Sequence, residues 1–172
     1  MGRLIFAAIG SVIFFFIAPS TVAGWVPWWI SKWRPQPPFF GLEPLRWLGA
    51  LLIGVGIAVV IETFARFVWQ GIGTPAPVFP TKHLVARGLY RYVRNPMYCG
   101  VLATILGQAL FLGDVRLLGY AAFVWLAFHL FVLTYEEPTL RRTYGADYDA
   151  FCAAVPRWIP RRQRRHVASE SE

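Results

Sequence analysis

The chain has 172 residues, of which 56% are hydrophobic and only 15% are charged, and its formal net charge is +8. Soluble domains usually carry about a quarter charged residues, so the composition argues against an ordinary soluble domain. Seven of the 17 basic residues follow position 140 with no nucleic-acid-binding motif, which favours an anionic lipid surface over nucleic acid as their partner.

Long apolar runs predict four membrane-spanning helices. We expect them at residues 4–30, 45–69, 97–112 and 117–135. The first should bend near Pro19, and the last two should form a hairpin around the short connection 113–116. After Glu136, apolar residues recur every three or four positions, which predicts an amphipathic helix. A basic flexible tail follows from Arg161.

The expected fold class is therefore an all-α integral membrane protein with about four transmembrane helices and a cytoplasmic C-terminal amphipathic helix. We interpret it as one membrane domain over 1–172, made of two N-terminal helices (1–69), a C-terminal half (70–160) and a tail (161–172). Four spans bring both termini and the irregular loop 70–96 to one side. That side carries 12 basic residues against 4 on the other, so both termini are expected in the cytoplasm.

Three features inside the spanning helices need an interpretation. Glu62 and Arg66 are four residues apart, so they can pair on one helix face and neutralise each other. His129 either makes a polar packing contact or lines a pocket. Gly54 and Gly56 resemble a nucleotide-binding glycine motif, but no strand precedes them, and close helix packing is the better explanation.

Two segments concentrate the groups that could carry chemistry. Residues 82–100 are basic, aromatic and interrupted by glycine and proline, and residues 135–145 begin with Tyr135, Glu136 and Glu137. Both lie at the cytoplasmic ends of the same predicted hairpin, so they should be neighbours. The alternatives are a ligand pocket with cations on one wall and carboxylates on the other, or a helix end whose acids pair with the basic loop.

These segments resemble the membrane methyltransferases related to isoprenylcysteine carboxyl methyltransferase, in their bacterial form. The first family block corresponds to Leu84-Val85, Gly88-x-Tyr90 and Arg94-Asn95-Pro96-x-Tyr98-x-Gly100. The second corresponds to Glu136-Glu137-x-x-Leu140, Gly145-x-x-Tyr148 and Val155-Pro156-Arg157. Order and spacing agree in both blocks, which cover about residues 81–160.

The resemblance implies S-adenosylmethionine as cofactor and methyl transfer to a lipophilic or lipidated acceptor within the membrane lipids, at the cytoplasmic face of a bacterial inner membrane. The implied cofactor-binding residues are His83, Leu84, Val85, Tyr90, Arg94, Asn95, Pro96, Tyr98, Glu136 and Glu137. Arg94 and Glu137 are the candidate catalytic residues, with Arg94 able to hold the cofactor carboxylate and Glu137 as a helper. Neither Cys99 nor Cys152 has metal-ligand spacing, and no metal is expected.

Two departures from the family pattern bear on the substrate. Asn95 stands where the family usually has histidine, so proton transfer there is not expected. Val132 stands where prenylcysteine-methylating members have an arginine for the substrate carboxylate. The second departure argues against a prenylcysteine carboxylate and leaves a small lipid amine, thiol or hydroxyl, or another carboxylate, open as the acceptor. The alternative functions are a phospholipid N-methyltransferase with the same cofactor site, and a non-catalytic membrane subunit or small transporter.

Overall fold

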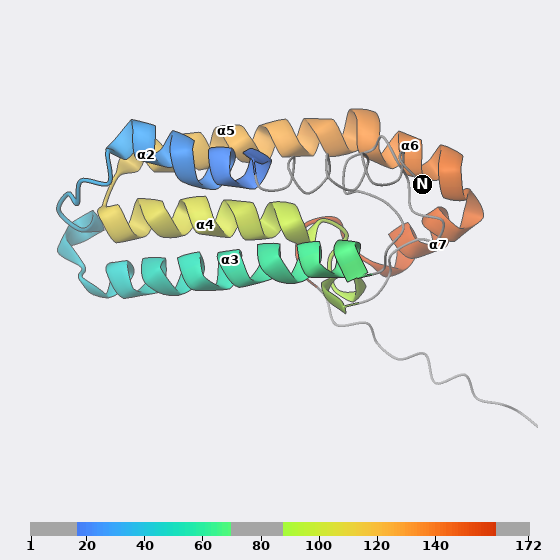
Figure 1. Cartoon of the computed structure of the whole chain (residues 1–172), viewed down its shortest axis with the longest axis horizontal. Coiled ribbons are helices and arrows are strands. Elements are labelled where there is room, and N and C mark those ends of the chain that lie inside the picture. The colour runs from blue at the N-terminus through green and yellow to red at the C-terminus, as the bar shows by residue number, and fades with distance from the viewer. Residues whose placement is uncertain (1–16, 70–87, 161–172) are drawn as a thin grey trace, which may run out of the picture.

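The computed structural model describes residues 17–69 and 88–160, and every regular element in these two ranges is a helix. The elements, in chain order, are η1 (Thr21–Trp25), α2 (Val26–Ser31), η2 (Phe39–Gly41), α3 (Pro44–Trp69), η3 (Gly88–Arg91), α4 (Pro96–Leu112), α5 (Val115–Phe131), η4 (Val132–Glu136), α6 (Glu137–Tyr144) and α7 (Ala146–Ala154). Helices α2, α3, α4 and α5 run lengthwise beside one another, and α6 and α7 lie at one end (Figure 1). The all-α prediction is confirmed for this part of the chain.

Two of the described helices are long and apolar enough to cross a membrane. They are Pro44–Arg66 and Val115–Tyr144, and α4 is a shorter apolar helix packed beside them. Large apolar side chains cover their outer surfaces, including Leu51 on α3 and Phe123 on α5. Exposed apolar side chains in this number suit a lipid environment, so the chain is a membrane protein that is helical throughout its described elements.

The first described helix is irregular directly after Pro19. Residues 17–20 are helical, and the π-helical turn η1 follows before α2 begins. The carbonyl of Val22 accepts from the Tyr120 hydroxyl at 2.9 Å, and the carbonyl of Ala23 accepts from Gln108 Nε2 at 2.6 Å. Side chains of α4 and α5 therefore satisfy carbonyls at the place where the sequence predicts a bend.

Glycines let α3 and α4 approach closely along their whole length. A Cβ built on Gly49 meets the backbone of Phe111 at 2.6 Å and of Gly107 at 2.7 Å, and Gly56 lies equally close to the Gly100 carbonyl. Gly54 has nothing within 4 Å. Close helix packing is thus the explanation for Gly56, whereas Gly54 lies in open space.

Replacing Gly49 with alanine is expected to lower the free energy of unfolding by about 1–3 kcal/mol, because the new methyl group would overlap backbone atoms that cannot move aside. Thermal unfolding in detergent measures the effect. Gly54→Ala on the same helix is the matched control and should be neutral or slightly stabilising. Equal losses in both variants would contradict this account of the packing.

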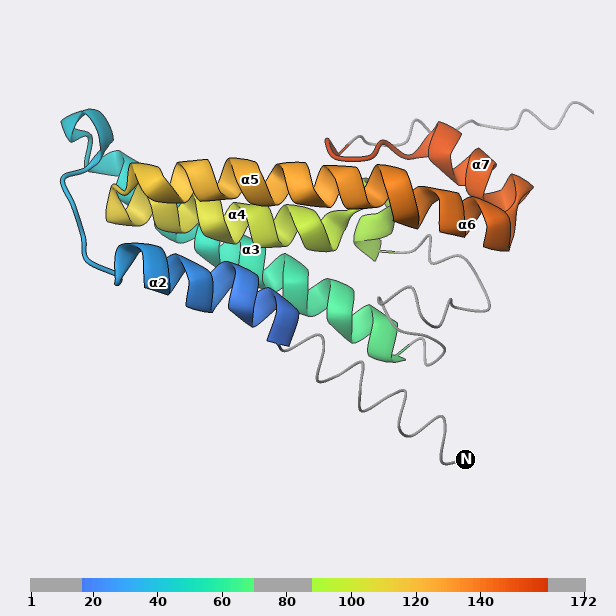
Figure 2. The same cartoon turned by 90° about the horizontal axis from the view of Figure 1, so that it is seen from above.

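The last spanning helix extends further than the sequence suggests. We expected its end at Tyr135, but α5 continues through η4 into α6 and ends at Tyr144 (Figure 2). The expected single amphipathic helix is accordingly two short helices, α6 and α7, separated at Gly145, whose φ is +54°. The π-helical turn lets the chain pass Pro138 without ending the helix.

Candidate functional site

The first predicted block forms the entry into α4. Tyr90 lies in the short helix η3, and Arg94 and Asn95 precede Pro96, the first residue of α4. Proline suits this position because its missing N–H has no helical partner there. Tyr98 follows in the first turn of α4, so this block presents its side chains at one end of the bundle.

The second predicted block lies in the π-helical turn and the start of α6. Glu136 ends η4 and Glu137 begins α6. The two carboxylates have different partners: Glu136 accepts from the Tyr98 hydroxyl, whereas Glu137 accepts from Arg94 and Arg157. The structure thus brings the two sequence blocks together and divides the glutamate pair between two clusters.

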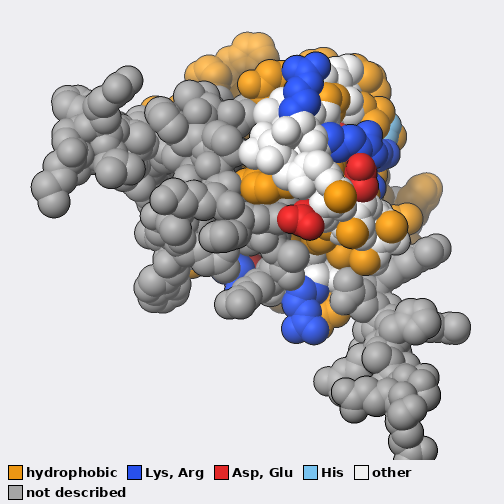
Figure 3. All heavy atoms as spheres, turned by 90° about the vertical axis from the view of Figure 1, so that its right-hand side faces the viewer, with side chains coloured by type: hydrophobic (Ala, Val, Ile, Leu, Met, Phe, Trp, Pro, Cys, Tyr) orange, Lys and Arg blue, Asp and Glu red, His pale blue; other side chains and the backbone are white. Residues whose placement is uncertain are grey.

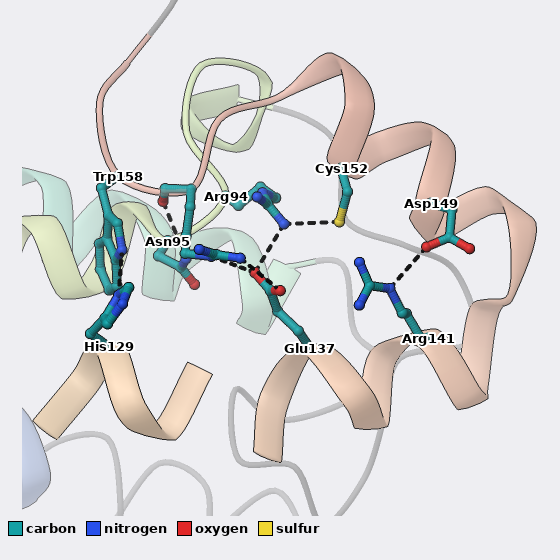
Figure 4. Close-up of polar contacts among 9 residues, drawn as sticks. Arg94, Asn95, His129, Glu137, Arg141, Asp149, Cys152 and Trp158 are labelled. Carbon is teal, nitrogen blue, oxygen red and sulfur yellow. Dashed lines mark hydrogen bonds and ion pairs between the residues drawn. The ribbon is translucent and has the colours of Figure 1, made fainter. Parts of the chain in front are cut away.

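Glu137 is the centre of what we call the charged hub, which comprises Glu137, Arg94 and Arg157 (Figure 4). Arg157 donates from Nε at 2.7 Å and from Nη2 at 3.0 Å, and Arg94 Nη1 donates at 3.0 Å. The Glu137 side chain is only 6% exposed. One carboxylate between two guanidinium groups leaves the hub with a net charge of +1.

The charged hub also contains a donor that has no hydrogen-bond partner in the described part of the chain. Arg94 Nη1 additionally contacts Cys152 Sγ at 2.9 Å, while Arg94 Nε is buried without a hydrogen-bond partner. An unsatisfied buried donor on a cation is costly in the absence of a ligand. The hub can therefore accept an anionic group such as a carboxylate.

A second group, which we call the tyrosine–glutamate cluster, consists of Tyr90, Tyr98 and Glu136. The Tyr98 hydroxyl donates to Glu136 Oε2 at 3.0 Å. Burial raises the pKa of the Tyr90 phenol well above its usual value, and the nearby carboxylates of Glu136 and Glu62 raise it further. Among the described residues, no lysine or arginine forms an ion pair with Glu136. The cluster is anionic and aromatic, which suits a cation.

A C-terminal strap, residues 155–160, holds the two helix ends together. The carbonyls of Pro156 and Arg157 accept from the Arg94 backbone N–H at 2.9 Å and from Asn95 Nδ2 at 3.2 Å. The Trp158 indole N–H donates to His129 Nδ1 at 3.1 Å. His129 thus makes a polar packing contact, and Asn95 anchors the strap.

Three residues of this arrangement were not singled out as site residues from the sequence: Arg157, Trp158 and Cys152. Arg157 was included in the second block as a motif residue, and its place after Val155-Pro156 is the signal that could have identified it as a site residue. The remaining predicted residues His83, Leu84 and Val85 lie outside the described residues. Figure 3 shows the end of the molecule where these groups meet, with basic and acidic side chains interspersed among apolar ones.

Comparison with known proteins identifies the family. The model that describes phospholipid methyltransferases matches residues 45–147. This range includes the whole first block and the second block as far as Gly145, whereas Tyr148 and Val155-Pro156-Arg157 lie beyond it. The chain belongs to the phospholipid methyltransferase family.

Its relatives carry two kinds of name. The chain is 36% identical over 121 residues to a phosphatidylethanolamine N-methyltransferase of Laccaria bicolor, covering 68% of this chain and 13% of that protein. It is 27% identical over 136 residues to protein-S-isoprenylcysteine O-methyltransferase B of Arabidopsis thaliana, covering 77% and 60%. A Schizosaccharomyces pombe protein-S-isoprenylcysteine O-methyltransferase is 36% identical over 78 residues, covering 45% and 33%. The predicted resemblance is confirmed.

The chain matches only part of each of these relatives. The chain spans between 13% and 60% of the lengths of these relatives. No solved structure matches it. Val132, at the position where the prenylcysteine-methylating pattern has arginine, is 1% exposed within η4 and supplies no cation to the site.

Proposed function

We propose that the chain is an S-adenosylmethionine-dependent methyltransferase that acts on a lipophilic acceptor at the cytoplasmic face of the membrane. The observation that carries this proposal is the adjacency of the cationic charged hub and the anionic tyrosine–glutamate cluster, joined through the neighbouring residues Glu136 and Glu137. Family membership supports the same reaction.

The residues present fit this cofactor. Its amino-acid part carries a carboxylate and an ammonium, and its sulfonium is a second cation. Arg94, whose Nε lacks a protein partner, suits the carboxylate, while Glu136 with the Tyr98 ring suits a cation. When bound, the cofactor supplies an electrophilic methyl group. The predicted contributions of His83, Leu84 and Val85 remain part of the proposal.

The protein's own contribution is mainly orientation. Methyl transfer is an in-line displacement that needs little acid–base assistance, so holding the two reacting groups in line supplies most of the acceleration. Glu137 acts in this scheme by fixing Arg94 and Arg157, and we therefore treat it as a positioning residue. Stacking of Tyr98 on Phe128, with a centroid distance of 4.5 Å, keeps the aromatic wall in place and excludes water.

The membrane arrangement is also part of the proposal. We infer four spans, of which the first includes residues outside the described ranges, and place both termini in the cytoplasm of a bacterial inner membrane. The excess of 12 basic residues over 4 supports this orientation. It puts the site at the cytoplasmic end of the bundle, where a water-soluble cofactor and a lipid headgroup can meet.

The relatives' names carry two activities, isoprenylcysteine O-methylation and phosphatidylethanolamine N-methylation, and we infer N-methylation of a phospholipid for this chain. The family model and the Laccaria bicolor relative are both named for methylation of phospholipids. The buried Val132 in place of an arginine removes the group that suits a prenylcysteine carboxylate. An amine-headed phospholipid is therefore the first acceptor to test.

Calorimetry on the detergent-purified protein tests the proposal directly. We expect micromolar binding of S-adenosylmethionine and of S-adenosylhomocysteine, and transfer of labelled methyl groups into a lipid extract. A folded protein that binds neither compound would favour a membrane subunit or small transporter. Binding without transfer to any lipid or lipidated acceptor would identify a family member that has lost its activity.

A further inference from the structure

Glu62 lies on α3 beside the entry into α4. Helices α3 and α4 are antiparallel neighbours, and a Cβ built on Gly100 would meet Val59 and Val60 side chains at 3.0 and 2.9 Å. Thr63, one residue after Glu62, is fully buried, whereas Ile61, one residue before it, is 60% exposed. Glu62 therefore lies between the lipid-facing side of α3 and the side that packs on α4, close to the N-terminal end of α4 at Pro96.

One oxygen of the Glu62 carboxylate has no hydrogen-bond partner among the residues that the structure describes. Oε1 pairs with Arg66 Nε, which accounts for the ion pair expected from the sequence. Oε2 is buried and accepts no hydrogen bond. The nearest hydroxyl on the helix, that of Thr63, donates to the carbonyls of Val59 and Val60 instead. Buried carboxylate oxygens usually accept a hydrogen bond, so Oε2 is suited to a donor from a ligand.

Arg66 is held in place on its other side. The Arg66 guanidinium packs against the backbone of Gly88, whose φ of +62° is readily adopted only by glycine. This contact ties the Glu62–Arg66 pair to η3, the helix that carries Tyr90. Rotation of the pair toward solvent would separate it from η3, so Glu62 Oε2 is kept inside the bundle.

Glu62 also lies near the tyrosine–glutamate cluster. The Glu62 and Glu136 carboxylates both act electrostatically on the Tyr90 phenol, so the two approach Tyr90 from different helices. Glu136 belongs to the site already described, whereas Glu62 comes from the membrane-spanning helix α3. The result is a second carboxylate at the border between the site and the lipid.

We propose that Glu62 is a specificity-determining residue, whose Oε2 accepts a hydrogen bond from the nitrogen of an amine-headed lipid acceptor. The inference rests on the proposed methyltransferase function and adds the residue that selects the acceptor. Because Arg66 occupies Oε1, the specificity rests on Oε2, which offers an acceptor to an N–H group and no donor to a carboxylate acceptor. The Glu62 side chain is 32% exposed and its neighbour Ile61 is 60% exposed, so a lipid in the bilayer can approach the Glu62 side chain.

An amino group could also come from the cofactor, whose α-ammonium has the same chemistry. The two sources are separated by measuring cofactor and acceptor binding independently. S-adenosylhomocysteine retains the ammonium but lacks the sulfonium. Dioleoyl phosphatidylethanolamine presents N–H donors, and dioleoyl phosphatidic acid, with the same acyl chains, presents none on nitrogen.

The test compares the full-length wild type, Glu62→Gln and Glu43→Gln in mixed micelles. Glu43 is the matched control, because it also pairs with an arginine on the α3 side of the chain, Arg46, but lies at the opposite end of the helix. For Glu62→Gln we expect binding of phosphatidylethanolamine to weaken about ten- to thirtyfold. S-adenosylhomocysteine binding, melting temperature and the weak binding of phosphatidic acid should stay within twofold or a few degrees of the wild type.

The outcomes separate this inference from the proposed function. Wild-type binding of the cofactor without binding of phosphatidylethanolamine, or equal lipid binding by wild type and Glu62→Gln, would overturn the inference alone. A matching loss of S-adenosylhomocysteine binding in Glu62→Gln would assign Oε2 to the cofactor and also overturn it. Failure of the wild type to bind either cofactor compound would overturn the proposed function instead.

Discussion

Replacing Glu137 with glutamine is expected to destabilise the protein more than any other single change at the site. The substitution leaves the buried Arg94 and half-buried Arg157 without a counter-charge, although the shape of the side chain is kept. Breaking a buried ion pair by removing one partner costs roughly 3 kcal/mol or more. Thermal unfolding in detergent should therefore show a clearly lower melting temperature, together with loss of cofactor binding.

The control for Glu137 is a carboxylate that has an exposed partner. Asp149 accepts from Arg141 at 2.9 Å, and both side chains are more than half exposed. Asp149→Asn should change the melting temperature little, because exposed pairs contribute little to stability. An unchanged melting temperature in Glu137→Gln, combined with a large fall in turnover, would instead assign Glu137 the catalytic role that the sequence suggested.

The charged hub also anchors the strap, so Glu137→Gln should affect more than the ion pairs of Glu137. Arg157 is the only member of the charged hub within the strap, and its neighbour Trp158 holds His129. Releasing Arg157 therefore loosens a segment that also bonds the backbone of Arg94 and the side chain of Asn95. Stability and binding are expected to fall together for this reason.

The bounds of α3 and α4, the start of α5 and the meeting of the described parts of the two motif blocks were predictable, because apolar length and the hairpin connection determine them. The partners of the glutamates were not. Whether Glu136 or Glu137 faces the tyrosines depends on the π-helical turn before Pro138, and helical periodicity alone assumes a regular turn. For the same reason we expected the last spanning helix to end at Tyr135, whereas it continues through the π-helical turn to Tyr144.

Side-chain contacts between different elements of the bundle could not be predicted from the sequence either. The spacing of Glu62 and Arg66 predicted their ion pair, because both lie on one helix. The hydrogen bond between Trp158 and His129 joins residues that are 29 positions apart on different elements, and no local sequence pattern predicts it. Asn95 was expected to line the pocket, whereas its amide bonds the strap, a role that follows from tertiary packing.

Replacing Glu136 with glutamine is expected to abolish most activity while preserving the fold. Among the described residues, Glu136 is bonded to the Tyr98 hydroxyl and to no cation, so its charge stabilises the protein little and is available to a ligand. Removing one preorganised charged group aimed at the reacting centre lowers kcat/KM by about a hundred- to thousandfold. Labelled methyl transfer, cofactor calorimetry and thermal unfolding together measure the effect.

Tyr98→Phe is the matched control for Glu136, because it removes the hydroxyl that donates to this carboxylate and keeps the ring that stacks on Phe128. We expect a smaller loss of activity, about tenfold, since the negative charge remains. A Glu136→Gln variant that retains cofactor affinity and turnover would show that the anionic cluster is structural. In that case the cation of the ligand must be held by another group, and the charge separation between Glu136 and the charged hub would have no part in the reaction.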